Sequence, residues 1–252
     1  MNGTHVRWSL KRIVLFAGIG VWAMASSAYP QNTAVIEGGP HDLSNGSAVR
    51  NTDATIAGQT CIFCHTPHGG ANNIPLWNRT APTGATYQLY TSSTSNVSTT
   101  AGQVAASVSG ACLSCHDGTI AMDVLVDVNG IAGPSVAFTR QAGTAKATYT
   151  GAGGNTMGGG LPFLGSDLRN DHPVAVVYET ARAAASTEFV AQVVNGQRIT
   201  VGAANPVPLY GASGATATVE CASCHNAHNN SLGNFLRKAN TGSAICLSCH
   251  IK

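Results

Sequence analysis

The strongest constraint on this 252-residue chain is a five-residue string, C-x-x-C-H, that occurs four times. The copies read CIFCH, CLSCH, CASCH and CLSCH, and together they use all eight cysteines of the sequence. In each copy a histidine directly follows the second cysteine. Any fold of this chain must therefore bring the same three side chains together four times. The copies lie at residues 61–65, 112–116, 221–225 and 246–250.

The histidine decides the chemistry of these strings. C-x-x-C alone is found in redox dithiols, zinc ribbons and local disulfides. C-x-x-C-H is the attachment signal for c-type haem. On a helical turn, positions i, i+3 and i+4 share one face, so two thiols and an imidazole can meet one porphyrin from one side. We predict four haem c groups, attached through Cys61, Cys64, Cys112, Cys115, Cys221, Cys224, Cys246 and Cys249, with proximal iron ligands His65, His116, His225 and His250.

Four further histidines match the four haems one to one, once His5 near the N-terminus is set aside. Methionine is the usual rival as a sixth ligand of haem iron. Only Met122 and Met157 follow the N-terminal segment and could compete. The sequence therefore predicts bis-histidine ligation at every iron. The predicted distal ligands are His41, His68, His172 and His228.

Two of the motifs carry a second histidine, in CIFCHTPH at 61–68 and CASCHNAH at 221–228. Axial ligands approach an iron from opposite faces of the porphyrin, and histidines three residues apart cannot straddle one haem. The second imidazole is therefore expected to reach a neighbouring haem. By spacing along the chain, we predict that His68 serves the haem of Cys112/Cys115, that His228 serves that of Cys246/Cys249, and that His172 and His41 complete the other two in either order.

The N-terminus has the pattern of a secretory signal peptide. Three basic residues precede the apolar run 13–23, and small residues follow it. The run is short for a spanning helix, although an uncleaved anchor is the alternative. We predict a signal peptide over residues 1–28, cleaved near Ala25 or Ala28, and a single tetrahaem cytochrome domain over residues 29–252. The protein is thus expected to be exported, to the extracellular side or the outer cell surface rather than the periplasm.

Composition argues against long regular elements. Only 10% of residues are charged and 6% are aromatic. The Gly-, Ala- and Ser-rich stretches 79–111 and 130–166 are typical of loops. We predict a multihaem cytochrome c fold that is mostly coil, with short helices at the C-x-x-C-H motifs, a few short strands and a core formed by haems. The β-branched or alternating patterns favour strands at 174–179, 198–201 and 216–220.

Charge and ligation together narrow the function class. Without the signal peptide the chain has ten basic and eleven acidic residues, and no basic stripe typical of nucleic-acid binding. Substrate chemistry at haem needs an open or weakly held position on iron. Because every iron has a candidate distal ligand, we expect an electron carrier and not an enzyme. A haem reductase would require one five-coordinate iron.

Several motifs follow one another in an order that resembles a known family. The chain is similar to the extracellular multihaem cytochromes of metal-reducing bacteria, most closely those of the OmcE type. The resemblance implies an outer-surface protein that polymerises into a filament with a continuous chain of haems, in which one distal histidine crosses a subunit boundary. The matching segments are HDLS at 41–44, CIFCHTPH at 61–68, PLWNRT at 75–80, CLSCHDGT at 112–119, NDHPV at 170–174, VECASCHNAH at 219–228 and ICLSCH at 245–250.

Two functions from different classes are compatible with these observations. One is a filament-forming conductor that carries electrons to extracellular acceptors, and the other is a discrete periplasmic or cell-surface shuttle that docks with redox partners. His41 is the expected ligand in trans, because an N-terminal segment can reach a neighbouring copy most easily. In both cases the partners are redox proteins or extracellular acceptors, or further copies of the chain.

Overall fold

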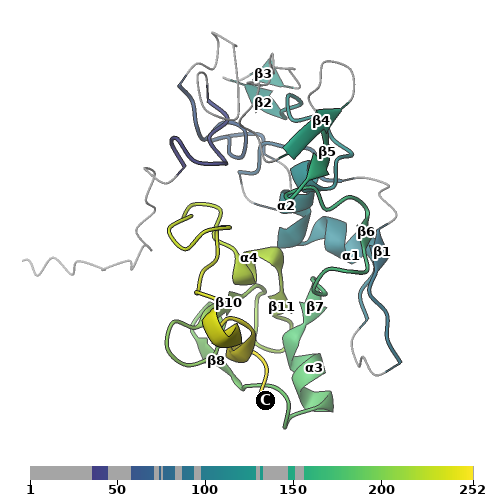
Figure 1. Cartoon of the computed structure of the whole chain (residues 1–252), viewed down its shortest axis with the longest axis vertical. Helices are drawn as coiled ribbons and strands as arrows, with labels where there is room; N and C mark the ends of the chain where they lie inside the picture. Colours follow the sequence, from purple (N-terminus) through teal and green to yellow (C-terminus); the bar gives the residue numbers. More distant parts are fainter. Residues whose placement is uncertain are drawn as a thin grey trace, which may run out of the picture. The chain divides into compact units, whose positions relative to one another are not determined.

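The protein is represented by a computed structural model, which describes residues 36–44, 58–70, 74, 76–82, 87–93, 98–128, 131–132, 147–150 and 156–251. Within these ranges the chain is mostly turns, bends and irregular backbone that connect short elements (Figure 1). The predicted coil-rich fold class is confirmed. The predicted signal peptide, residues 1–28, lies outside the described residues and stays a prediction. None of the described helices has the length and apolar character that crossing a membrane requires.

The first two helices, α1 (Ala101–Ala106) and α2 (Val108–His116), form a tight pair that carries the second motif. Thr100 and Gln103 form a reciprocal capping box at the start of α1. Gly110 lies so close to the carbonyl of Ala105 that a Cβ there would collide with it. Small residues therefore permit the close approach that positions the end of α2. The other helical elements are α3 (Tyr178–Ala184), α4 (Cys221–Cys224), η2 (Thr241–Ser243) and η3 (Cys246–Ser248).

Among the described residues the strands are short and form five separate small sheets. One sheet has three antiparallel strands in the order β10-β9-β8, and the other four are pairs, of which only β1–β6 is parallel. The remaining pairs are β2–β3, β4–β5 and β7–β11. The strand bounds are β1 Gln88–Leu89, β2 Asp127–Val128, β3 Ile131–Ala132, β4 Ala147–Thr150, β5 Thr156–Gly160, β6 Asp167–Leu168, β7 Val176–Val177, β8 Gln192–Asn195, β9 Arg198–Val201, β10 Val207–Leu209 and β11 Thr218–Val219.

The element predictions were partly wrong. The stretch 79–111 was predicted as loop but contains β1, α1 and the start of α2, because the capping box and the small residues support helix there. The stretch 130–166 contains the β4–β5 hairpin. The predicted strand 198–201 is confirmed as β9. Only parts of the predicted strands 174–179 and 216–220 are extended, and helix α3 begins at Tyr178.

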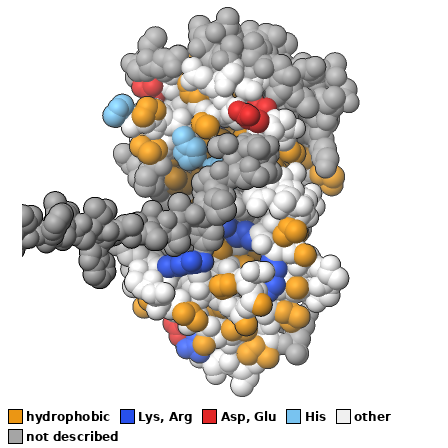
Figure 2. All heavy atoms as spheres, turned by 90° about the vertical axis from the view of Figure 1, so that its left-hand side faces the viewer, with side chains coloured by type: hydrophobic (Ala, Val, Ile, Leu, Met, Phe, Trp, Pro, Cys, Tyr) orange, Lys and Arg blue, Asp and Glu red, His pale blue; other side chains and the backbone are white. Residues whose placement is uncertain are grey.

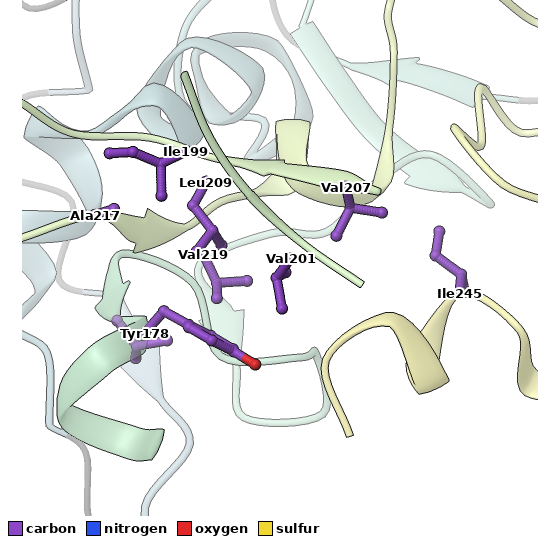
Figure 3. Packing of buried hydrophobic residues seen from close by; sticks show 9 residues of the cluster. Tyr178, Ile199, Val201, Val207, Leu209, Ala217, Val219 and Ile245 are labelled. Atoms are coloured by element: carbon purple, nitrogen blue, oxygen red, sulfur yellow. The ribbon is translucent and has the colours of Figure 1, made fainter. Parts of the chain in front are cut away.

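Hydrophobic side chains form three separate clusters in the described part of the chain. The largest gathers the inner faces of β7, β9, β10 and β11 around the ring of Tyr178 (Figure 3). The partly buried Cys224 and Cys249 pack against this cluster, so it supports the third and fourth motifs. Its buried members are Val176, Tyr178, Ile199, Val201, Val207, Leu209, Ala217, Val219 and Ile245.

The other two clusters lie beside the first and second motifs. The first contains Ile62 and Phe63 of the motif CIFCH, together with the buried Met122 and Met157, the rival iron ligands. The third packs Leu113 of α2 against Tyr87 and Val104, among others. The first and second motifs thus each have an apolar cluster beside them, and the third and fourth share one. That haems complete the interior stays a prediction.

Candidate haem-binding sites

Each motif adopts the helical turn that its spacing predicts. In three motifs the histidine N–H donates to the carbonyl of the first cysteine, four residues earlier. The N···O distances are 2.8 Å for His65, 2.9 Å for His225 and 2.9 Å for His250. The fourth, His116, is the last residue of helix α2. The two thiols and the imidazole of each motif therefore share one face of one turn.

Beyond that turn, three of the four proximal histidines enter an isolated antiparallel bridge. His65 pairs with Trp77, His225 with Leu236 and His250 with Phe189. In each case a backbone N–H of the second segment donates to the carbonyl of the motif's second cysteine, at 2.8–2.9 Å. The bridge fixes the backbone on both sides of the histidine. In these three motifs a local turn and a distant segment together orient the backbone that carries the imidazole.

Four of the described histidines have a backbone carbonyl oxygen close to their Nδ1 atom. The Nδ1 atoms of His116, His172 and His225 lie 2.6–2.8 Å from the backbone carbonyl oxygens of Pro162, Pro173 and Asn234 respectively. His41 Nδ1 lies 3.4 Å from the carbonyl of Ala227. A carbonyl at Nδ1 fixes the tautomer and leaves Nε2 to bind a metal.

The histidine rings come together in pairs from distant parts of the chain. The ring centroids of His41 and His116 lie 6.2 Å apart. Those of His65 and His228 lie 6.1 Å apart, and those of His172 and His250 lie 6.4 Å apart. Each pair joins one proximal histidine with one predicted distal histidine.

This spacing fits an iron between the two rings. A metal–imidazole bond of about 2 Å on each side, plus about 1 Å from each nitrogen to its ring centre, places two ligating rings about 6 Å apart. All eight thiols are free, as covalent attachment requires. The donor set, the spacing and the engaged Nδ1 atoms therefore fit haem c, and the individual ligand roles stay a prediction.

The rings do not meet in the pairs that sequence spacing predicts, and which histidine ligates which haem stays a prediction. His228 faces His65 of the first motif, not His250 of the fourth. His41 faces His116, where His68 was expected. The reason is tertiary packing. The segment 36–44 reaches the loop after the third motif, where the His41 ring stacks on Phe235 with centroids 4.2 Å apart. Proximity along the chain does not determine which rings meet.

His68 and His225 are left over from this pairing. Within the described part of the chain neither ring forms a pair of this kind, although His225 lies near enough to His41 and His116 to lower the pKa of both. The His68 ring is exposed on the loop after the first motif. His225 is exposed too, with its Nδ1 held by Asn234. Figure 2 shows histidine side chains open to the surface on one face of the molecule.

Successive motifs approach one another through their thiols. Burial raises the pKa of Cys64 to about 12, and the nearby Cys115 of the second motif adds to this. A hydrogen bond with Cys221 of the third motif raises the pKa of Cys112. Burial also raises the pKa of Cys249 to about 12, with Cys224 of the third motif adding to it. The motifs are thus neighbours in the order in which they occur in the sequence.

The environment keeps the His41 imidazole neutral. Burial lowers the pKa of His41 to about 4, and repulsion by His116 adds to this effect. Burial likewise lowers the pKa of His116. A neutral imidazole is the form that binds a metal.

Several residues at the site had no role assigned to them from the sequence. Asn234 and Phe235 both adopt the left-handed region, with φ of 48° and 56°. There the Asn234 carbonyl meets His225, while the Phe235 ring stacks on His41. Two buried ionisable side chains, Arg79 and Glu220, also lie between motifs. Only the capping position of Glu220, directly before CASCH, could have drawn attention to it.

Comparison with known proteins supports haem attachment at the motifs. A family model described as the doubled CXXCH motif matches residues 214–252, which contain the third and fourth motifs. No curated protein matches the chain significantly. The doubled motif, together with two further copies of the same string, indicates a multihaem c-type cytochrome with up to four haems. Haem c, when attached, supplies a one-electron iron couple, and the function of such a domain is electron transfer.

Proposed function

We propose that the chain binds four bis-histidine haems and polymerises into an extracellular filament that exports electrons over long distances, as the resemblance to OmcE-type cytochromes implies. We further propose that His68 of one copy ligates the haem of Cys221/Cys224 in the next copy. The pairing of the histidine rings carries this proposal. Three pairs are complete within one chain, and one proximal and one distal histidine remain.

The assignment of the trans ligand to His68 replaces the expectation for His41. Residues 36–44 do not form a free arm in the structure, because Asp42, Leu43 and Ser44 are buried and His41 lies against His116. His68 is exposed on a loop held by Thr66, whose hydroxyl donates to the His68 carbonyl at 2.8 Å. An exposed imidazole on an ordered loop is suited to reach a neighbouring copy.

A set of bis-histidine irons supports conduction and not substrate turnover. Each ligand pair occupies both axial positions, so within a filament no iron has an open coordination site. We therefore propose that the protein is not an enzyme and acts outside the cell, after removal of residues 1–28. The order of the motif thiols supports a continuous path for electrons from the first motif to the fourth.

Electron microscopy of the purified, haem-loaded protein tests the assembly, beside the matched variants His68→Ala and His41→Ala. We expect filaments in the parent and in His41→Ala, and single particles in His68→Ala. Both variants should show one high-spin haem in their absorption spectra. Filaments that persist in His68→Ala contradict the ligand in trans. Single particles in all three proteins identify the alternative, a discrete periplasmic or cell-surface shuttle.

A further inference from the structure

Arg79 is a buried cation without a carboxylate partner. Its side chain is 1% exposed, and its guanidinium donates to the backbone carbonyls of Ser114, Ala121 and Met122 at 2.9–3.1 Å. Its Nε has no hydrogen-bond partner. Neither of the two ion pairs among the described residues includes Arg79. Among the described residues its guanidinium is thus held by backbone carbonyls and forms no direct ion pair with a carboxylate.

This cation lies between the first and second motifs. The neighbouring Asn78 donates through its backbone N–H to the carbonyl of Cys64 at 2.9 Å. Ser114, an acceptor for Arg79, lies between the two cysteines of the second motif. The charge of Arg79 also acts on the Cys64 thiol, where it opposes the increase in pKa that burial causes.

Glu220 is a buried anion in the equivalent place between the second and third motifs. Its side chain is 2% exposed and directly precedes Cys221. Its Oε2 accepts from the hydroxyls of Ser107 and Ser109 and from the Ser109 N–H, at 2.5–3.1 Å. Its Oε1 accepts from the Thr218 hydroxyl at 2.6 Å. Every one of these partners is a donor, as a carboxylate requires.

We propose that these two buried charges grade the reduction potentials along the haem chain. Arg79 raises the potential of the haem on Cys61/Cys64, and Glu220 lowers the potential of the haem on Cys221/Cys224. The inference depends on the proposed haem loading and does not depend on filament assembly. It predicts that electrons move downhill within one chain from the third motif toward the first.

The physical reason is the charge change at iron. Oxidation adds one positive charge, so a nearby cation disfavours the ferric form and a nearby anion favours it. At an effective dielectric constant of about 20, a unit charge within roughly 10–12 Å changes the ratio of reduced to oxidised haem about tenfold. For one electron, a tenfold change corresponds to about 59 mV.

Other charged groups near these motifs act less strongly or on a different haem. Arg237 lies beside the third motif and opposes Glu220, but its side chain is partly exposed, so water and salt screen it. Asp117 follows His116 and is buried, where it accepts from the Tyr87 hydroxyl at 2.7 Å. The haem of the second motif, which lies between Arg79 and Glu220, therefore experiences charges of both signs.

A spectroelectrochemical titration of the full-length, haem-loaded protein tests the inference without assigning single haems. Arg79→Gln should move the high-potential end of the curve down by about 59 mV, a tenfold change. Glu220→Gln should move the low-potential end up by a similar amount. The double variant should then titrate over a narrower range than the parent. A shift at the same end in both variants, or no shift in Glu220→Gln, overturns the proposal.

Matched variants separate charge from packing. Arg79→Lys and Glu220→Asp keep the charges, so their curves should follow that of the parent. If Glu220→Asp instead behaves like Glu220→Gln, packing and not charge sets the potential, and the proposal fails. Arg237→Gln should shift the curve less than Glu220→Gln, and only at low salt. Haem content is measured first by the pyridine haemochrome assay: fewer than four haems in the parent contradicts the proposed loading, whereas four haems with unchanged potentials contradicts only this inference.

Discussion

The regions 61–79 and 221–238 are two versions of one structural unit. Each begins with a C-x-x-C turn, continues through a histidine in an antiparallel bridge, and carries a second histidine three residues later. The returning segment contains a left-handed residue directly before the bridge, Leu76 with φ of 62° or Phe235 with φ of 56°. The same local geometry is therefore built twice from largely different side chains.

The two units differ in the fate of the second histidine. His228 meets His65 of the other unit, whereas His68 contacts no histidine ring in the described part of the chain. Local spacing fixes how far a second imidazole stands from its own motif. Which ring it meets is decided by the segments that pack around the unit. The difference teaches that the motif places a second imidazole beside its turn and that the fold decides which ring this imidazole meets.

The units also differ at the residue that braces the motif. Asn78 donates to the carbonyl of Ile62, and Arg237 donates to the carbonyl of Ala222, which is the corresponding position in the other motif. Asn78 is neutral and fully buried, whereas Arg237 is charged and partly exposed. One brace therefore belongs to the interior, and the other is accessible to water.

Removing the second histidine of either unit, in chains too dilute to assemble, should produce the largest difference between the two units. At concentrations too low for assembly, the parent should bind carbon monoxide at one haem, the one that lacks its ligand in trans. His228→Ala should bind it at two haems, because His65 loses its partner. His68→Ala should still bind it at one. No carbon monoxide site in the dispersed parent, together with one site in dispersed His68→Ala, would show that His68 ligates within its own chain.

Removing the two braces should have unequal effects on stability. Asn78→Ala deletes bonds to the Ile62 and Asp127 carbonyls and to the Asp127 N–H, all at 2.7–2.8 Å. We expect a loss of about 2–4 kcal/mol in the free energy of unfolding, because these buried groups lose their partners. Arg237→Ala should cost only about 1 kcal/mol, since water can replace its bonds. Guanidinium denaturation followed at the Soret band measures both, and equal losses would remove the distinction.

The smallest expected effect concerns the turn that carries each second histidine. The Asn226 side chain accepts from the His228 N–H at 3.1 Å, and Thr66 does the same for His68 at 3.4 Å. Asn226→Ala should weaken the hold on His228 by about 1 kcal/mol, which corresponds to about fivefold faster ligand exchange. Thr66→Ala should leave exchange in dispersed chains unchanged. Stopped-flow binding of carbon monoxide to the reduced protein compares the two rates.

Sequence reasoning predicted the local chemistry and missed the long-range arrangement. The turns at the four motifs follow from the i, i+3, i+4 spacing, and all eight candidate ligands were identifiable as histidines outside the N-terminal segment. The pairing of His65 with His228 was not predictable from spacing, because it joins residues at opposite ends of the described chain.

The helices α1 and α2 were not predicted, although the sequence contains a signal for the first of them. Thr100 and Gln103 have the spacing of a capping box, which marks a helix start. The abundance of small residues obscured this signal, since alanine, serine and glycine were read as loop composition. The brace Asn78 and its buried neighbour Arg79 carried no such signal, because their burial depends on segments up to about 49 residues away.

The three ring pairs have a consequence for the unfolded chain. Under the proposed ligation, each iron closes a loop, from His41 to His116, from His65 to His228, and from His172 to His250. A cross-link over a loop of about 100 residues removes denatured-state entropy worth about 4–5 kcal/mol. The loop from His65 to His228 overlaps each of the other two in sequence, so it links all three closures. Under the proposed ligation, these linked loops stabilise one folded structure in a chain with few helices and strands.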